Sequence, residues 1–198
     1  MQPEAHTDRE YVEAFRALAA RIAASLAGGP ATALPVHMYV AGGAALHFYT
    51  GSRVSADIDA VFSRRVALPE GLETAWRDES GRARLLYFDT QYNDTFGLMH
   101  EDAHDDSLPL SLEGIDSTVL DVRLLTPLDL AVSKLGRFSS QDQDDIAALA
   151  RKGLITAGVL TERATEALAA YVGNVARLRG NIAAAARLVA SAVGEGRD

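Results

Sequence analysis

Apolar residues recur at helical spacing in two separate parts of the chain. Between Tyr11 and Leu26 they follow one another three or four positions apart, which predicts an amphipathic helix. From Thr126 to Val193 almost all of the sequence has helical spacing. That stretch opens with "TPLD", in which a threonine can cap a helix and a proline stands at its first position. The pattern therefore predicts an early helix and a helical segment that fills the last third of the chain.

Short apolar or alternating runs in the middle of the chain predict strands. They are residues 36–41, 56–62, 82–92 and 118–125. Two further stretches predict short helices, residues 43–51 and residues 69–78. This order of elements indicates an α+β fold, with a small mixed sheet flanked by helices in residues 1–125 and a C-terminal helical lobe in residues 126–198.

Composition narrows the class of protein. The 198 residues include no cysteine, which excludes disulfides and thiolate metal sites. The net charge of -8 and the pI near 5.1 disfavour broad, non-specific binding to nucleic acid. No apolar run approaches the roughly 20 residues of a membrane helix, and the N-terminus lacks the apolar core of a signal peptide. We therefore expect a soluble, cytoplasmic protein with no membrane partner.

A glycine pair in the stretch "VAGGAALHFYTGSRVSADIDAVF" suggests an anion site. A strand that ends at Gly42 and Gly43 and opens into a helix lets backbone N–H groups approach a phosphate closely. The helix N-terminus adds a partial positive charge. Arg53 and Ser55, a few residues later, supply a cationic and a hydroxyl contact for the same phosphates.

Two carboxylates follow the glycine pair. Asp57 and Asp59 alternate along a predicted strand, so their side chains point to the same face. Two carboxylates on one face suit a hard divalent cation, and Mg²⁺ in proteins is held by one or two carboxylates together with substrate phosphates. The glycines and the carboxylates together predict a metal–triphosphate site.

At these residues the chain resembles the DNA polymerase β-like nucleotidyltransferases. That superfamily carries a glycine pair followed, after a gap, by Asp-x-Asp between apolar residues, and "AGGAALHFYTGSRVSADIDAVF" matches this pattern. The resemblance implies the nucleotidyltransferase fold and a nucleoside triphosphate as substrate. It also implies that Mg²⁺ or Mn²⁺ binds at Asp57 and Asp59.

A second block, residues 126–149, resembles the region after the core in abortive-infection and type IV toxin nucleotidyltransferases. There one helix carries Lys-Leu and a later helix carries Asp-x-x-Asp, which Lys134 and Asp142 match here. The resemblance implies that Lys134 lies near the triphosphate and that Asp142 supports catalysis. Gln141 replaces the arginine that usually precedes this aspartate. From the residues alone, Lys134 beside an apolar stripe is instead expected to be a lysine at the rim of the core.

The superfamily places a third carboxylate on a neighbouring strand, where it activates the attacking hydroxyl or completes the metal shell. Asp89 in "LLYFDTQY" and Asp121 in "TVLDVRLL" both fit this description. Asp89 is preferred because it follows the Asp-x-Asp strand after one predicted helix. Some toxin-type relatives lack this residue altogether.

The resemblance implies an enzyme that moves a nucleoside monophosphate from the triphosphate to an acceptor hydroxyl. The toxin-like block implies RNA, a tRNA end or a protein as acceptor, and a toxin that pairs with a cognate antitoxin. The alternative is an inactive protein of this fold that binds a nucleotide or a partner without turnover. The retained serine and aspartates argue against that alternative.

Residues 100–104, "HEDAH", satisfy the zinc-hydrolase motif His-Glu-x-x-His. The motif requires a helix that places both histidines on one face. Here Gly97 lies just upstream, acidic residues follow, and the window has no apolar helical face. We therefore expect a solvated acidic loop without zinc, and a zinc hydrolase using His100, Glu101 and His104 is a remote alternative.

Overall fold

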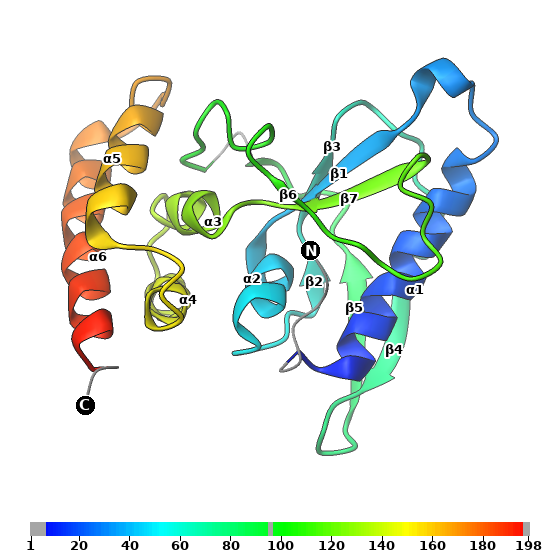
Figure 1. Ribbon diagram of the computed structural model, residues 1–198, viewed down its shortest axis with the longest axis horizontal. Coiled ribbons are helices and arrows are strands. Elements are labelled where there is room, and N and C mark those ends of the chain that lie inside the picture. Colours follow the sequence, from blue (N-terminus) through cyan, green and yellow to red (C-terminus); the bar gives the residue numbers. More distant parts are fainter. Residues whose placement is uncertain (1–6, 95–96, 196–198) are drawn as a thin grey trace. The chain divides into compact units, whose positions relative to one another are not determined.

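The protein is described by a computed structural model that covers residues 7–94 and 97–195. Its contacts divide the chain into two compact units. The first comprises Met1–Tyr92 and Ser107–Leu124, and the second comprises Asn93–Asp106 and Leu125–Asp198. Figure 1 labels the helices and strands of each unit.

The first unit contains, within its described residues, two α-helices, a 3₁₀ helix and seven strands. In chain order these are α1 (Arg9–Leu26), η1 (Ala31–Ala33), β1 (Val36–Val40), α2 (Gly42–Thr50), β2 (Asp57–Ile58), β3 (Ala60–Phe62), β4 (Glu73–Arg77), β5 (Ala83–Phe88), β6 (Leu108–Pro109) and β7 (Leu120–Leu124).

The strands form two small mixed sheets. In the first sheet the order is β3-β1-β7-β6, with β1 parallel to β7 and antiparallel to β3. In the second the order is β2-β5-β4, with β2 parallel to β5 and β4 antiparallel to it. The predicted α+β class is confirmed, with two sheets where the sequence predicted one.

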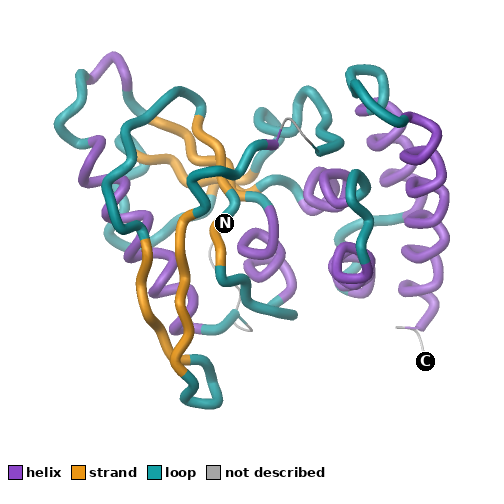
Figure 2. The backbone as a smooth tube through the Cα atoms, turned by 180° about the vertical axis from the view of Figure 1, so that it is seen from behind, coloured by secondary structure: helices purple, strands orange, loops and turns teal. Residues whose placement is uncertain are grey.

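Helix α1 covers one face of the second sheet, where it packs against β4 and β5 (Figures 1 and 2). Its apolar stripe is buried, as its helical spacing predicts. The ring of Tyr11 meets Trp76 of β4 edge to face at 5.4 Å, and Phe15 meets Phe48 of α2 at 5.1 Å. Burying one such side chain stabilises a fold by about 1.5–3 kcal/mol, so these rings anchor α1 to both α2 and the sheet.

The helix predicted for residues 69–78 is wrong, because this segment contains strand β4. All five residues of β4 pair with β5, and the pair Trp76 and Arg84 lies on the face toward α1. Arg21 of α1 also donates to the carbonyls of Gly71 and Glu73. These contacts come from distant parts of the chain, and they outweigh the weak helical spacing of the segment.

The predicted strand at residues 56–62 is present but divided. Its first part, β2, belongs to the second sheet, and its second part, β3, belongs to the first sheet. Asp59 lies between the two parts. The carbonyl of the preceding residue bonds to the chain after β5, whereas the carbonyl of Asp59 accepts a hydrogen bond of 2.8 Å from the N–H of Ala41, after β1. The two sheets of the first unit therefore meet at Asp59.

The second unit is helical over most of its described residues. It contains α3 (Pro127–Lys134), α4 (Ser140–Arg151), α5 (Ala157–Ala167) and α6 (Val175–Glu195). The first three begin at capping residues, Thr126, Ser139 and Thr156, whose side chains accept from backbone N–H groups. Helix α6 packs against α4 and α5. The predicted C-terminal helical region is therefore confirmed.

A buried ion pair joins two parts of the second unit. The guanidinium of Arg163 on α5 donates to both carboxylate oxygens of Asp129, at 2.8 and 3.1 Å. It also donates to Asp106 at 2.6 Å, at the end of the segment 97–106. Asp129 is only 1% exposed, so this bidentate contact satisfies a charge that would otherwise be costly to bury.

Candidate functional site

The glycine pair lies where β1 ends and α2 begins. Gly42 has a φ of +59°, which favours glycine, and a Cβ atom at this position would come within 1.9 Å of Oδ2 of Asp59. A Cβ atom at Gly43 would lie 2.8 Å from Oγ of Ser55 and 2.9 Å from Nη1 of Arg53. Three of the predicted site residues therefore pack directly against the glycine pair, and only glycine leaves room for them.

The N-terminus of α2 has no side-chain cap. The residue before the helix is Ala41, which has no side-chain acceptor for the first N–H groups of the nine-residue helix. Arg53 lies beside these N–H groups, at Gly43. Free donors at a helix N-terminus and an adjacent guanidinium suit a phosphate.

The two aspartates of the motif lie beside this helix N-terminus. The hydroxyl of Ser55, which is buried, donates a short hydrogen bond to Oδ1 of Asp57. Ile58, between the two aspartates, is 1% exposed and anchors the strand in the core. Asp57 and Asp59 are both half-buried. The alternation predicted from the sequence thus holds both carboxylates on the side of the glycines.

The backbone of Asp89 lies beside the segment that carries these two carboxylates. It directly follows β5, and its N–H donates to the carbonyl of Ile58 at 3.1 Å, which extends the parallel pairing of Asp57 with Tyr87 by two residues. Opposite residues in such a pairing share a face, so Asp89 is the neighbour of Asp59. Its Oδ1 atom accepts from the N–H of Gln91 at 2.8 Å.

Asp121, the other candidate for the third carboxylate, lies elsewhere in the first sheet. It pairs in register with His37 at the start of β1, whereas the glycine pair follows the end of that strand. Its Oδ2 atom is 2.9 Å from Nδ1 of His37 and 3.0 Å from Nη1 of Arg123. These contacts give Asp121 a structural explanation, and its distance from the glycines favours Asp89.

His47 of α2 supports the loop that carries Arg53, a role that the sequence analysis missed. The side chain is buried, and its Nε2 atom accepts from the N–H of Asp8, the N-cap of α1, at 2.9 Å. The other nitrogen, Nδ1, must then carry a proton, which it donates to the carbonyl of Arg53 at 2.9 Å. This role follows from the contact of His47 with Asp8, which is distant in the sequence, so local spacing does not reveal it.

Tyr11 lies behind the same site. Its ring contacts His47 edge to face at 4.9 Å, and its side chain is fully buried. Burial raises the pKa of Tyr11 well above its usual value, and the nearby carboxylates of Asp57 and Asp59 raise it further. The phenol therefore stays protonated at every physiological pH and adds no charge to the site.

Lys134 and Asp142 belong to the second unit, where both form ion pairs. Nζ of Lys134 lies 2.7 Å from Oδ2 of Asp145, and both side chains are buried. Asp142 completes a capping box with Ser139 at the start of α4. Arg137 donates to both oxygens of Asp142 at 2.8 Å. The predicted contributions of Lys134 and Asp142 to catalysis stay predictions.

Burial alone would raise the pKa of Asp142, but hydrogen bonds from Arg137 and Ser139 outweigh it and lower this pKa to about 2. The carboxylate is therefore ionised at neutral pH and acts as an acceptor for the cap of α4 and for Arg137.

The segment "HEDAH" forms turns and no helix. Nδ1 of His100 accepts from the N–H of Asp102 at 3.1 Å, and its Nε2 atom lies 3.4 Å from Glu166. Nε2 of His104 lies 3.0 Å from Asp94 instead. The two histidines thus face different carboxylates. Over residues 7–94 and 97–195, no group of three or more His, Cys, Asp or Glu side chains is arranged to hold a metal ion.

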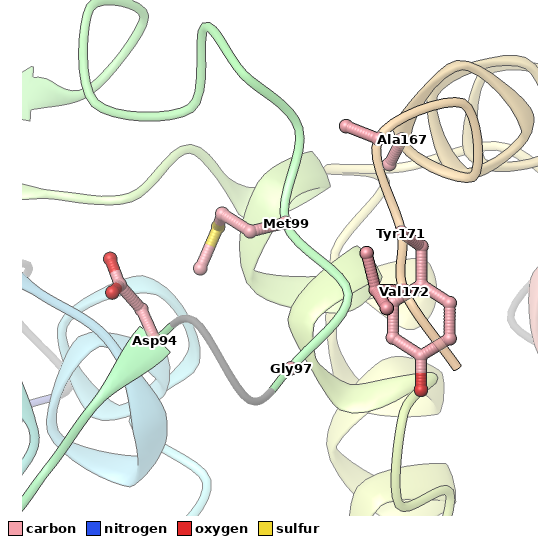
Figure 3. A pocket seen from close by; sticks show the side chains of 7 residues that line it. Asp94, Gly97, Met99, Ala167, Tyr171 and Val172 are labelled. Atoms are coloured by element: carbon pink, nitrogen blue, oxygen red, sulfur yellow. The ribbon is translucent and has the colours of Figure 1, made fainter.

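A pocket of about 290 Å³ lies within the second unit, and Figure 3 shows its lining. Met99, Tyr171 and Val172 give it an apolar wall, and Asp94, the partner of His104, is its one charged lining residue. It contains none of the predicted site residues. Four of the predicted nucleotide contacts therefore lie together in the first unit, namely Gly42, Gly43, Arg53 and Ser55, whereas the fifth, Lys134, belongs to the second unit.

The chain belongs to a protein family described as nucleotidyltransferase of unknown function (DUF6036), whose family model matches residues 23–181. This range includes the glycine pair, the aspartates and the second block, and it confirms the predicted nucleotidyltransferase superfamily. No curated protein and no solved structure matches the chain. Among the described residues, no helix has the length and apolar character needed to cross a membrane.

Proposed function

We propose that the protein transfers a nucleoside monophosphate from a nucleoside triphosphate to an acceptor hydroxyl, with a divalent cation bound at Asp57 and Asp59. The observation that carries this proposal is the packing of Asp59 against Gly42 and of Ser55 and Arg53 against Gly43. The carboxylate proposed to bind the cation and the groups proposed to bind the phosphates thus pack against the same glycine pair.

The side chains fit magnesium. Asp57 and Asp59 supply hard oxygen donors, and no third protein ligand is needed where phosphate oxygens and water complete an octahedral shell. Manganese prefers similar oxygen ligands and fits the same set. A bound divalent cation would neutralise charge on the phosphoryl oxygens and orient the attacking oxygen.

The other site residues bind the phosphates, position Asp57 and accept a proton. The N–H groups of Gly42 and Gly43 and the guanidinium of Arg53 bind the phosphates, and Ser55 holds Asp57 in place. The acceptor oxygen bonds to the α-phosphorus as the bond to pyrophosphate breaks. Asp89 takes the proton of the acceptor hydroxyl, which makes it the general base. The resemblance adds Lys134 as a triphosphate contact and Asp142 in a supporting role.

Calorimetric titration of the four common nucleoside triphosphates, with and without Mg²⁺, tests this proposal. The wild type should bind at least one of them in a Mg²⁺-dependent way. Asp57→Asn combined with Asp59→Asn keeps the shape of both side chains and should abolish that dependence. Asp144→Asn, an exposed carboxylate of α4, serves as the matched control. Equal Mg²⁺-dependent affinity in the double variant and the wild type would contradict the proposal.

Turnover and biological role need separate measurements. Pyrophosphate release distinguishes an active transferase from an inactive protein that only binds nucleotide.

We propose RNA, a tRNA end or a protein as the acceptor and a toxin role with a cognate antitoxin, on the resemblance alone. Growth arrest on expression of the wild type, absent in the Asp57→Asn variant, would support the toxin role.

A further inference from the structure

The second sheet has one covered face and one open face. Ile58, Leu86 and Phe88 point to the side of α1 and are buried. Because side chains alternate along a strand, Leu85 and Tyr87 of β5 point to the opposite side. There they are 48% and 40% exposed, so two large side chains of β5 are in contact with solvent on the same face.

This open face adjoins the candidate cation site. Tyr87 pairs in register with Asp57 of β2 on one side and with Glu73 of β4 on the other. Directly opposite residues of neighbouring strands share a face and lie about 5 Å apart. Tyr87 and Asp57 are therefore cross-strand neighbours on one face of the sheet, and Asp89, two residues further along the chain, continues that face.

The glycine pair lies on the other edge of β2. Successive carbonyls of an extended strand point to opposite edges. The carbonyl of Ile58 accepts from Asp89 beside β5, whereas the next carbonyl, that of Asp59, accepts from Ala41, which precedes the glycines. The Asp57–Asp59 segment thus has the glycine pair, proposed to bind the phosphates, on one edge and Tyr87 and Asp89 on the other.

This arrangement assigns a direction to the reaction. In an in-line displacement the attacking oxygen and the leaving oxygen lie on opposite sides of the phosphorus. If pyrophosphate leaves toward Gly42 and Gly43, the acceptor hydroxyl must approach from the edge where Tyr87 and Asp89 lie. We infer that Tyr87, with Leu85 beside it, is the acceptor subsite, and that it binds a flat aromatic or apolar group of an acceptor without negative charge. This inference rests on the proposed function and, of the acceptors proposed there, selects a protein over RNA or a tRNA end.

The negative charge around Tyr87 favours an acceptor without negative charge. An exposed tyrosine ring offers a surface for stacking, and one stacked ring contributes on the order of 1–3 kcal/mol. Glu73 and Asp89 flank the ring, and the whole chain carries a net charge of -8. A polyanion such as RNA would be repelled here, whereas an aromatic compound without negative charge gains stacking. A cationic aromatic compound also gains an attraction to the carboxylates.

The probe for this subsite is tyrosinamide, which has an aromatic ring, a hydroxyl group and a positive charge. Its affinity is measured by NMR titration of protein labelled at tyrosine, in the presence of Mg²⁺ and a non-hydrolysable nucleoside triphosphate. Tyr87→Ala should weaken tyrosinamide binding about tenfold, which corresponds to about 1.4 kcal/mol. Tyr87→Phe keeps the ring and should retain the wild-type affinity. Tyr171→Ala, which changes a tyrosine of the second unit, is the matched control.

Nucleotide titration of the same variants separates this inference from the proposed function. Mg²⁺-dependent triphosphate binding should be equal in the wild type, Tyr87→Ala and Tyr87→Phe. If the nucleotide binds but tyrosinamide does not, or binds Tyr87→Ala as tightly as the wild type, the acceptor subsite is overturned and the proposed function stands. Tighter, Tyr87-dependent binding of a hexa-adenylate RNA would overturn the stated class of acceptor. Absence of Mg²⁺-dependent triphosphate binding in the wild type would overturn the proposed function itself.

Discussion

Nζ of Lys134 on α3 lies 2.7 Å from Oδ2 of Asp145 on α4, and these side chains are only 7% and 3% exposed. A buried ammonium needs a partner, and a lysine at the rim of a core would instead extend its charge into water. The pair joins two helices of the second unit. Lys134 therefore has a structural role whether or not it also contacts a triphosphate.

Lys134→Met should destabilise the protein by about 3–5 kcal/mol, because it leaves the buried carboxylate of Asp145 without its cation. Adding Asp145→Asn should recover part of this loss. The measurement is urea unfolding of the two single variants and the double variant. Lys152→Met, which changes an exposed lysine at the end of α4, is the control and should be nearly neutral. A stable Lys134→Met protein with weakened triphosphate binding would instead make phosphate binding the main role of this lysine.

The contact between Gly42 and Asp59 gives a second prediction. Gly42→Ala forces a side chain into the left-handed region, which costs about 1–2 kcal/mol, and places a methyl group against the Asp59 carboxylate. Both stability and Mg²⁺-dependent nucleotide affinity should fall. Gly158→Ala is the matched control, because it lies in helix α5 with no atom within 4 Å of the added carbon. It should be neutral or stabilising by up to about 1 kcal/mol. Unchanged nucleotide affinity in folded Gly42→Ala would remove this contact from the site.

The two candidates for the third carboxylate are predicted to behave in opposite ways. Asp89→Asn keeps an acceptor for the N–H of Gln91, so stability should change by less than about 0.5 kcal/mol. Pyrophosphate release should fall by about 10²-fold or more, because the amide cannot accept the acceptor's proton.

Asp121→Asn weakens the contacts with His37 and Arg123 and should cost about 1 kcal/mol of stability. Nucleotide binding and pyrophosphate release should remain as in the wild type. Thermal unfolding and a pyrophosphate assay on both variants decide between the carboxylates. Loss of turnover in Asp121→Asn alone would reverse the assignment.

The site could be predicted where its chemistry is local in the sequence. The glycine pair and the alternating Asp57 and Asp59 are close in the chain, and strand alternation is enough to place both carboxylates on one face. Helix α1 and the cap Thr126 also follow local rules. These features depend on spacing, which the sequence contains in full.

Other features required long-range pairing. The choice between Asp89 and Asp121 depends on which strand lies beside β2, and the two candidates look alike within their own apolar runs. Strand β4 was predicted as a helix because its partner, β5, is what makes it extended. The contact of His47 with Asp8 and the pair of Lys134 with Asp145 likewise join residues from different elements. Tertiary contacts of this kind leave no periodic signal in the sequence.

The segment "HEDAH" is expected to bind no zinc. His100 and His104 face Glu166 and Asp94 respectively, so they do not converge on one ion. Elemental analysis of protein purified without added metal should show far less than one zinc per chain. Stoichiometric zinc that disappears in the variant with both His100→Ala and His104→Ala would contradict this expectation.

The carboxylate of Asp142 should make stability depend on pH in the acid range. Its pKa in the folded protein is about 2, below the usual value of 3.8, so its contribution to stability is fully present above about pH 4. The contribution is lost as the pH falls to about 2, where the folded protein also takes up the proton. Its partner Arg137 is 73% exposed, so screening by solvent limits the contribution to about 1–2 kcal/mol.

Asp142→Asn should therefore cost this amount at pH 7 in urea unfolding, and the difference from the wild type should shrink toward zero near pH 2. Arg137→Met removes the guanidinium half of the same ion pair, so the cost of combining it with Asp142→Asn should be smaller than the sum of the two single costs. A difference between wild type and Asp142→Asn that is equal at both pH values would show that ionisation of this carboxylate does not stabilise the cap of α4.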